Sequence, residues 1–346
     1  MRTCFGKGGL GLKLELGKIP SKLLGNRLLK LAGAPSKNIV VPPKLGVDFG
    51  VIRLQKGFLI VSSDPITGTT ENTGWYAVNV SANDVATSGN RPVYMQSVML
   101  LPEGASSAEL QDLWLQVHRS ARMLGISITG GHTEVTPKLK RPIVVTTAFA
   151  FGDSFVTAAD AKQGDSILLT KTAGIEGTSI LASHVPKLGA KVNHVFVSRA
   201  KKFREKLSVV EEAVAAYKTG SVHAMHDCTE GGVLGAVYEM ATASKKGFLL
   251  SVKDVPVARE TEEVCKAFKI DPLKLIGSGA LILAVERGAE PRVKAELEKI
   301  GVCATKIGEF TKRGKILVHP DGGEEKVFDA PVDELWRVEA MGYQSP

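Results

Sequence analysis

The chain has 346 residues, of which 44% are hydrophobic and 23% are charged, and its net charge is +8. This composition is ordinary for a globular protein, and the length allows two domains with a large core. Lysine and arginine are scattered, with clusters only near residues 138–141 and 199–206. A solvated basic surface or attraction of small anionic ligands is therefore favoured, and nucleic acid is not an expected partner.

The four cysteines, Cys4, Cys228, Cys265 and Cys303, form no CxxC pair and have no metal-ligand spacing. They are typical of reduced thiols in a cytosolic protein. No apolar run approaches the length of a membrane span, and the first residues lead into glycines rather than into a signal-peptide core. We therefore expect a soluble cytoplasmic protein with no membrane partner.

The segment Cys4–Gly11 is too rich in glycine for a packed element. A frayed terminus is the favoured interpretation. The alternative is a mobile flap whose amides and Lys7 close on phosphates. It is not a Walker A loop, because no Gly-Lys-Ser/Thr follows at the required spacing.

Two acidic residues flank a predicted hairpin. Val51–Leu54 and Phe58–Ser62 are predicted strands joined by a turn at residues 56–57. Asp48 precedes the first strand and Asp64 follows the second, so both are expected at the ends of adjacent strands. An acid in such a position often only caps a turn or a helix, and this is the favoured interpretation for either residue taken alone.

Residues 75–86 carry apolar side chains at helical spacing and predict a buried helix. Asn79, Asn83 and Asp84 lie within it, although such side chains compete for backbone hydrogen bonds. Gly89 can end the helix in a left-handed conformation. A polar face on an otherwise apolar helix usually faces water, and it faces a ligand site if other acids and glycines converge on it.

The rest of the first half adds three strands and one helix to a predicted α+β domain with a mixed sheet. Ser106-x-x-Glu109 is a capping box that opens a helix ending at Gly125. The apolar stripe of this helix is expected in the core, at Leu110, Leu113, Leu115, Val117, Ala121 and Leu124. The predicted strands are Arg91–Leu101, Ile126–Thr129 and Pro142–Phe151.

The second half begins again with a strand and alternates strands and helices, which predicts a second α/β domain. A linker is expected at Asp160–Gly164. The predicted strands are Ser166–Thr170, Phe248–Val252, Ala280–Val285 and Thr305–Glu309. The predicted helices are Ile175–Ser183, Glu205–Tyr217, Val233–Ala243, Glu260–Phe268 and Glu290–Ile300.

Four short segments place an acid beside glycine, serine, threonine or asparagine: Gly46–Gly50, Ser62–Pro65, Asn79–Gly89 and Asp227–Gly232. Hard oxygen ligands beside accessible backbone amides suit magnesium and polyphosphate. Carboxylates held close together repel one another unless a divalent cation lies between them. The glycines before the Val233 helix are expected to leave its first amides bare for an anion, although an N-cap followed by a tight turn is an equal alternative.

Six motifs occur in order: LGVDFGVI, SSDPI, VNVSANDVATSGNRP, GGHTE, HDCTEGG and GSGAL. Together they resemble the aminoimidazole-ribonucleotide synthetase (PurM-like) superfamily over residues 16–310, and within it most of all the hydrogenase-maturation proteins HypE. The resemblance implies an N-terminal domain, residues 1–155, that binds ATP and forms a homodimer through its sheet. It also implies a C-terminal domain, residues 160–346, that closes over the nucleotide.

The same resemblance implies phosphoryl transfer from ATP with Mg²⁺, in which positioning and charge neutralisation carry most of the catalysis. Asp84 and Asp64 are the implied catalytic residues. The implied metal ligands are Asp48, Asp64, Asp84 and Asp227. The implied cofactor-binding residues are Asp48, Asn83, Asp84, Thr229, Gly231, Gly232 and Lys171.

Three features depart from the family pattern. HypE proteins end in a cysteine that carries the reacting group, whereas no cysteine follows Cys303 here. His132 stands where the family usually has a carboxylate, and Glu134, which shares its face of a strand, is expected to restore the charge. The segment Cys4–Gly11 does not reproduce the catalytic segment of selenophosphate synthetase.

The predicted function is a HypE-like, ATP- and magnesium-dependent enzyme that activates a substrate oxygen, with an unassigned small-molecule or protein-derived acceptor. The alternatives are a nucleotide-binding regulator without catalysis, a true HypE, a thiamine-phosphate kinase or a selenophosphate synthetase.

Overall fold

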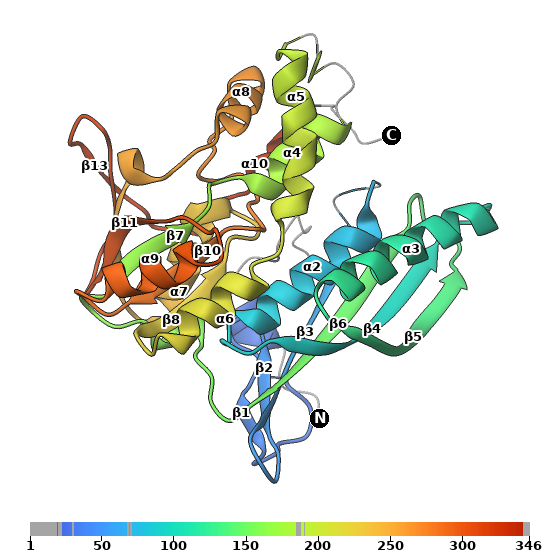
Figure 1. The fold of residues 1–346 in the computed structure, drawn as a ribbon, viewed down its shortest axis with the longest axis horizontal. Coiled ribbons are helices and arrows are strands. Elements are labelled where there is room, and N and C mark those ends of the chain that lie inside the picture. Colours follow the sequence, from blue (N-terminus) through green and yellow to red (C-terminus); the bar gives the residue numbers. More distant parts are fainter. Residues whose placement is uncertain are drawn as a thin grey trace, which may run out of the picture.

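The computed structural model describes residue 19 and residues 23–29, 31–67, 69, 71–184, 188–189 and 191–341. The segment Cys4–Gly11 lies outside these residues. The described chain forms two sheets with helices packed on them, one in each half of the sequence (Figure 1). Within the described residues, no helix has the length and apolar character needed to cross a membrane.

The first sheet has six strands in the order β1-β2-β3-β6-β4-β5. β4 and β5 pair in parallel and the other neighbours pair antiparallel, which is the predicted mixed sheet. β1 is short and has no counterpart among the predicted strands. The strands are β1 (Ile39–Val41), β2 (Gly50–Arg53), β3 (Phe58–Ile66), β4 (Pro92–Leu101), β5 (Ser127–Val135) and β6 (Ile143–Gly152).

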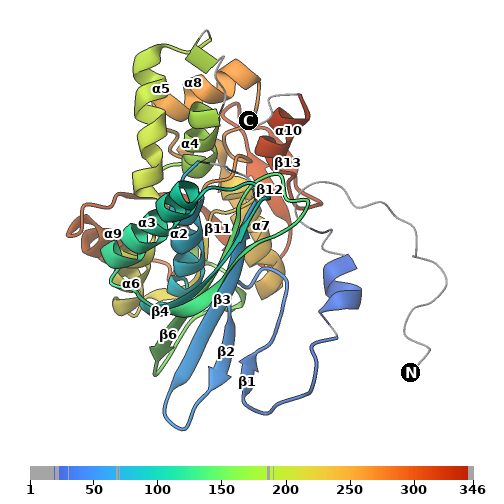
Figure 2. The ribbon, with the colours of Figure 1, turned by 90° about the vertical axis from the view of Figure 1, so that its right-hand side faces the viewer.

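Helices α2 (Thr73–Ala86) and α3 (Ser107–Met123) lie on one side of this sheet (Figure 2). The capping box at Ser106 and Glu109 is present, as predicted. Leu115 is 43% exposed, so its assignment to the core is wrong. The reason is helical geometry, because Leu115 lies two residues from both buried positions, Leu113 and Val117, and faces away from them. A short π-helix, Leu24–Leu28, precedes the first sheet.

The second sheet has seven strands in the order β13-β12-β9-β11-β7-β10-β8. Its strands are β7 (Ser166–Thr170), β8 (Val222–Asp227), β9 (Gly247–Ser251), β10 (Leu281–Val285), β11 (Ala304–Thr311), β12 (Lys315–Val318) and β13 (Glu324–Lys326). Its helices are α4 (Ile175–His184), α5 (His194–Lys201), α6 (Val210–Lys218), α7 (Gly232–Ser244), α8 (Arg259–Phe268), α9 (Glu290–Glu298) and α10 (Glu334–Ala340). Short 3₁₀ helices occupy Ala158–Asp160, Lys202–Lys206 and Val252–Asp254.

The helix α2 is buried along nearly its whole length, because it packs on β3 and β6 and also contacts α6 and β8 of the second half. Its polar side chains therefore bond to protein rather than to water. Asn79 Nδ2 donates to Ser120 Oγ at 2.9 Å, and Ser81 Oγ donates to the Thr146 carbonyl oxygen at 2.9 Å. This explains how a helix with so many polar residues can form in the interior.

The predicted helix Glu205–Tyr217 is wrong as a single element. The structure has a 3₁₀ helix up to Lys206 and then α6 from Val210, with a break at residues 207–209. Asn83 of α2 bonds to this break on both sides. Its Nδ2 donates to the Leu207 carbonyl oxygen at 2.7 Å, and its Oδ1 accepts from the Val209 amide at 2.8 Å. A contact distant in the sequence thus interrupts a locally helical pattern.

Replacing Asn83 with Ala should lower the free energy of unfolding by about 2–4 kcal/mol, because it leaves the Leu207 carbonyl and the Val209 amide unpaired in a buried place. Urea unfolding monitored by circular dichroism measures this change. The exposed Asn38 is the matched control, and Asn38→Ala should shift stability by less than about 0.5 kcal/mol. Equal effects of the two substitutions would contradict this role for Asn83.

Candidate active site

Four carboxylates from different elements meet between the two halves of the chain. Asp48 precedes β2, Asp64 lies in β3, Asp84 lies in the last turn of α2, and Asp227 ends β8. Asp64, Asp227 and Asp48 all act electrostatically on Asp84. The structure thus brings together the residues that were expected to hold a metal.

Two hydroxyl groups orient these acids. Ser62 Oγ lies 2.8 Å from both Asp84 Oδ2 and the Asp48 carbonyl oxygen, and Thr87 Oγ1 donates to Asp48 Oδ2 at 3.2 Å. Asp64 was expected after the end of a strand, but β3 continues to Ile66 and Asp64 lies within it. The longer strand fixes the backbone of Asp64 by pairing it with Thr146 of β6.

Burial and like charges make this a costly place for carboxylates. Asp84 is only 7% exposed, and burial, followed by the charge of Asp64, raises its pKa well above the usual value. Asp227 is fully buried, and neither of its carboxylate oxygens has a hydrogen-bond partner among the described residues. A buried carboxylate without partners is strongly unfavourable, so this oxygen donor set fits a divalent cation such as Mg²⁺.

His226 also belongs to this site and was not among the predicted residues. Its Nδ1 lies 3.3 Å from Asp48 Oδ1, and its Nε2 lies 3.1 Å from Glu239 Oε2 of α7. Burial disfavours the charged ring, but Asp48, Asp227 and Glu239 outweigh it and raise the pKa of His226 well above its usual value. The feature of the sequence that could have identified His226 is its position next to Asp227. It did not reveal that Asp48 comes close to the ring from the other half of the chain.

Two predicted cofactor-binding side chains are engaged elsewhere. Asn83 bonds to the break before α6, as described above. Lys171 Nζ lies 2.8 Å from Glu212 Oε2 and 2.7 Å from the carbonyl oxygens of both Ser208 and Gly279. Asn83 thus joins α2 to the second half of the chain, and Lys171 connects segments within the second half.

The loop before α7 differs from the expected anion site. The Gly231 amide donates to Asp333 Oδ2 at 2.6 Å, and the Gly232 amide donates to the Thr229 carbonyl oxygen at 3.0 Å. The expectation that the amides of Gly231 and Gly232 are bare is therefore wrong, and the alternative of a tight turn before the helix agrees with the bond to Thr229. Asp333 is the N-cap of α10 and accepts from the Leu335 amide with its other oxygen, at 2.8 Å. The Asp333 carboxylate thus caps α10 and also accepts a hydrogen bond from the Gly231 amide.

A second acidic group lies beside this loop. Burial raises the pKa of Glu176, at the start of α4, to about 7, and the charges of Asp333, Asp227 and Glu230 add to this effect. Burial also raises the pKa of Asp333 to about 6, although backbone amides oppose it. Glu230 accepts a hydrogen bond from the indole of Trp336. This part of the site therefore carries groups that titrate near neutral pH.

His132, the residue that departs from the family pattern, lies away from the four carboxylates of the same chain. His132 Nε2 contacts Glu134 Oε2 at 2.9 Å, and the two side chains are 62% and 50% exposed. They lie on β5, the edge strand, three positions from β3 in the sheet. The structure thus places Glu134 next to His132, but it does not bring the pair to the four carboxylates.

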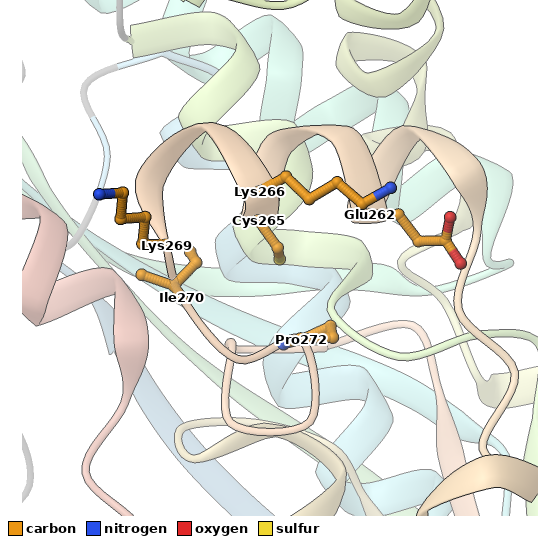
Figure 3. Close-up of a pocket in the computed structure, with 6 residues that line it drawn as sticks. All are labelled: Glu262, Cys265, Lys266, Lys269, Ile270 and Pro272. Atoms are coloured by element: carbon orange, nitrogen blue, oxygen red, sulfur yellow. The ribbon is translucent and has the colours of Figure 1, made fainter. Parts of the chain in front are cut away.

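A shallow cavity of about 500 Å³ lies on α8 and the loop after it (Figure 3). None of its lining residues belongs to the acidic site. They are Glu262, Cys265, Lys266, Lys269, Ile270 and Pro272.

Both halves of the chain match models of one protein family. Residues 46–151 match the family model of the AIR synthase related protein N-terminal domain, and residues 162–319 match that of the C-terminal domain. A protein of Methanocaldococcus jannaschii from the hydrogenase expression/formation group is 24% identical over 327 residues, which are 92% of this chain and 95% of the relative. Carbamoyl dehydratase HypE of Escherichia coli is 29% identical over 279 residues, 78% of this chain and 79% of the relative.

Solved structures agree with this result. A crystal structure of E. coli HypE superposes with a TM-score of 0.70 at 26% identity and covers 88% of this chain and 96% of its own. A structure of the maturation protein HypE in complex with ATP gives a TM-score of 0.69 at 23% identity, with 81% and 88% covered. The fold is therefore the two-domain PurM-like α+β fold that the motifs predict.

Proposed function

Since the chain belongs to the family of AIR synthase related proteins, we propose that it is an ATP- and magnesium-dependent enzyme that activates a substrate oxygen by phosphoryl transfer. The observation that carries the proposal is the meeting of four carboxylates from both halves of the chain, one of which, Asp227, is buried without a hydrogen-bond partner among the described residues. The relation to carbamoyl dehydratase HypE and to a HypE structure with ATP supports the choice of nucleotide. The acceptor is a small molecule or a protein-derived group.

In this proposal each acid acts as a ligand. Asp48, Asp64, Asp84 and Asp227 would hold Mg²⁺, which when bound neutralises the charge of the phosphates during transfer. Ser62 and Thr87 keep the Asp84 and Asp48 carboxylates in fixed orientations through the hydrogen bonds described above. The site needs both halves of the chain, because Asp227 alone comes from the second sheet.

The second candidate is a nucleotide-binding regulator without catalysis, which the resemblance supports because His132 stands where a carboxylate is expected. Calorimetry with ATP and Mg²⁺, combined with measurement of ADP and phosphate release over a panel of carboxylate, carbamoyl and alcohol acceptors, separates the two. ADP formation with at least one acceptor supports the enzyme. Tight binding without any release supports the regulator, and no ATP binding would refute both.

We further propose that the chain forms a homodimer through the face of the first sheet opposite α2 and α3. Along β4 and β6 buried residues alternate with more exposed ones, and Tyr94 and Phe151 on the open face are 45% and 50% exposed. Their rings pack edge to face, with centroids 6.1 Å apart. Neighbouring exposed aromatic side chains on a sheet are typical of a protein interface.

Replacing Phe151 with Asp should convert the dimer to a monomer, since it would place a charge in the apolar interface. Sedimentation equilibrium measures the molecular mass. Phe328, which is 79% exposed and lies outside the first sheet, provides the control, and Phe328→Asp should remain dimeric. A wild-type protein that is monomeric at all concentrations would refute the proposed interface.

A further inference from the structure

His226 lies at one end of the acidic site, close to two of its carboxylates. One ring nitrogen of His226 and one carboxylate oxygen from each of Asp48 and Asp227 all lie within 4.8 Å of one another. We propose that these three residues form a binding site for a transition-metal dication of the Mn²⁺ or Co²⁺ type, with Glu239 supporting the histidine from outside. This inference rests on the proposed function, because it specifies the metal at one end of the same site.

The distances fit a shared ion. Nδ1 lies 3.3 Å from Asp48 Oδ1 and 3.8 Å from Asp227 Oδ1. Ligands bonded to one ion at about 2.0–2.2 Å lie about 3–4 Å apart. Both oxygens of Asp227 lack hydrogen-bond partners among the described residues, although the side chain is fully buried. A cation would satisfy these oxygens and offset the cost of burying the charge.

Glu239 gives the ring the orientation that a ligand needs. A histidine that binds a metal usually donates its other N–H to a carboxylate or a carbonyl group, which fixes the tautomer and the ring plane. Here Nε2 lies 3.1 Å from Glu239 Oε2, so a proton on Nε2 leaves Nδ1 for the metal. Nδ1 also lies 2.9 Å from the Asp227 carbonyl oxygen, and metal binding would replace a proton shared there.

A single nitrogen ligand changes which metal ion the site binds most tightly. Mg²⁺ favours oxygen ligands, whereas imidazole suits first-row transition ions, whose affinities increase from Mn²⁺ to Co²⁺. The site also spans both halves of the chain, because Asp48 precedes β2 and the other two ligands end β8. A bound ion would therefore connect the two halves directly.

The test uses the metal-free full-length protein without nucleotide. Isothermal titration with Co²⁺, Mn²⁺ and Mg²⁺ should give an affinity for Co²⁺ at least about tenfold above that for Mg²⁺. Pulsed EPR of bound Mn²⁺ should show coupling to an imidazole ¹⁴N nucleus. This spectroscopic result needs no variant, so it remains informative if a substitution at His226 prevents folding.

Three variants complete the experiment. His226→Gln should remove the ¹⁴N coupling and the preference for Co²⁺, and Glu239→Gln should weaken Co²⁺ binding about 10- to 100-fold. The matched control is His223→Gln on the same strand, because His223 Nδ1 faces Asp165 at 2.9 Å instead of the acidic site. This control should leave both the coupling and the affinities unchanged.

Bound Mn²⁺ without nitrogen coupling, equal affinities for Co²⁺ and Mg²⁺, or no binding at millimolar metal would each overturn the inference. These outcomes are distinct from failure of the proposed function. ATP turnover with Mg²⁺ but without nitrogen coupling refutes only the transition-metal site, whereas a ¹⁴N-coupled ion in a protein that never binds ATP refutes only the proposed function.

Discussion

Asp84→Asn should reduce ATP turnover by about two to three orders of magnitude and, at the same time, stabilise the metal-free protein by about 1–2 kcal/mol. Asn keeps the shape of Asp and an oxygen that accepts from Ser62 Oγ, which lies 2.8 Å away, but it removes a buried charge close to Asp64, Asp227 and Asp48. Without metal, loss of that charge relieves repulsion. With metal and ATP, it removes a ligand that neutralises the ion.

ADP formation at saturating ATP and urea unfolding in the presence of a chelator measure the two effects. Asp112, which lies exposed on α3, is the control, and Asp112→Asn should change neither quantity appreciably. If Asp84→Asn left turnover unchanged, the assignment of the site would be wrong. If it lowered the stability of the metal-free protein, the carboxylates would not be repelling one another as the structure indicates.

Glu176→Gln should stabilise the protein in a way that depends on pH. The buried Glu176 carboxyl has a pKa of about 7 in the folded protein, against an ordinary value of 4.5, chiefly because of burial. The folded state therefore holds the proton that the unfolded state releases, so wild-type stability is retained below pH 4.5 and falls as the pH rises towards 7. A glutamine at position 176 does not titrate in this range, so the difference in stability between the variant and the wild type reports on Glu176.

The gain from Glu176→Gln should thus be near zero at pH 4.5 and approach roughly 3 kcal/mol above pH 8, at 1.36 kcal/mol per unit of pKa shift. Urea unfolding at several pH values measures it. The exposed Glu298 serves as the control, and Glu298→Gln should show little change at any of these pH values. A gain from Glu176→Gln that is the same at pH 5 and pH 8 would show that Glu176 does not titrate as described.

Local patterns allowed much of the fold to be predicted from the sequence. The helix over residues 75–86 followed from its apolar spacing, the start of α3 from its capping box, and the hairpin of β2 and β3 from its turn. The acidic residues of the site were also recognisable, because each lies in a short motif with glycine or a hydroxyl residue. Spacing within a few residues determines these features, so a single sequence contains the necessary information.

Contacts between distant segments could not be predicted in this way. Asp333 reaches the Gly231 amide across 102 positions, and Asn83 reaches the Val209 amide across 126. Asp333 accepts a hydrogen bond from an amide that the glycine pattern predicted to be bare. Asn83 bonds where a continuous helix was predicted, and the helix is interrupted there. The approach of Asp48 to His226 is of the same kind, because it depends on how the two halves of the chain pack.

The most direct test of the proposed ATP site is a crystal structure with a non-hydrolysable ATP analogue and a divalent cation. We predict that the terminal phosphate and the cation lie among Asp48, Asp64, Asp84 and Asp227, with a free pocket for the acceptor beside the phosphate. A nucleotide bound with its phosphates away from these four carboxylates, for example in the cavity on α8, would contradict this account of the protein.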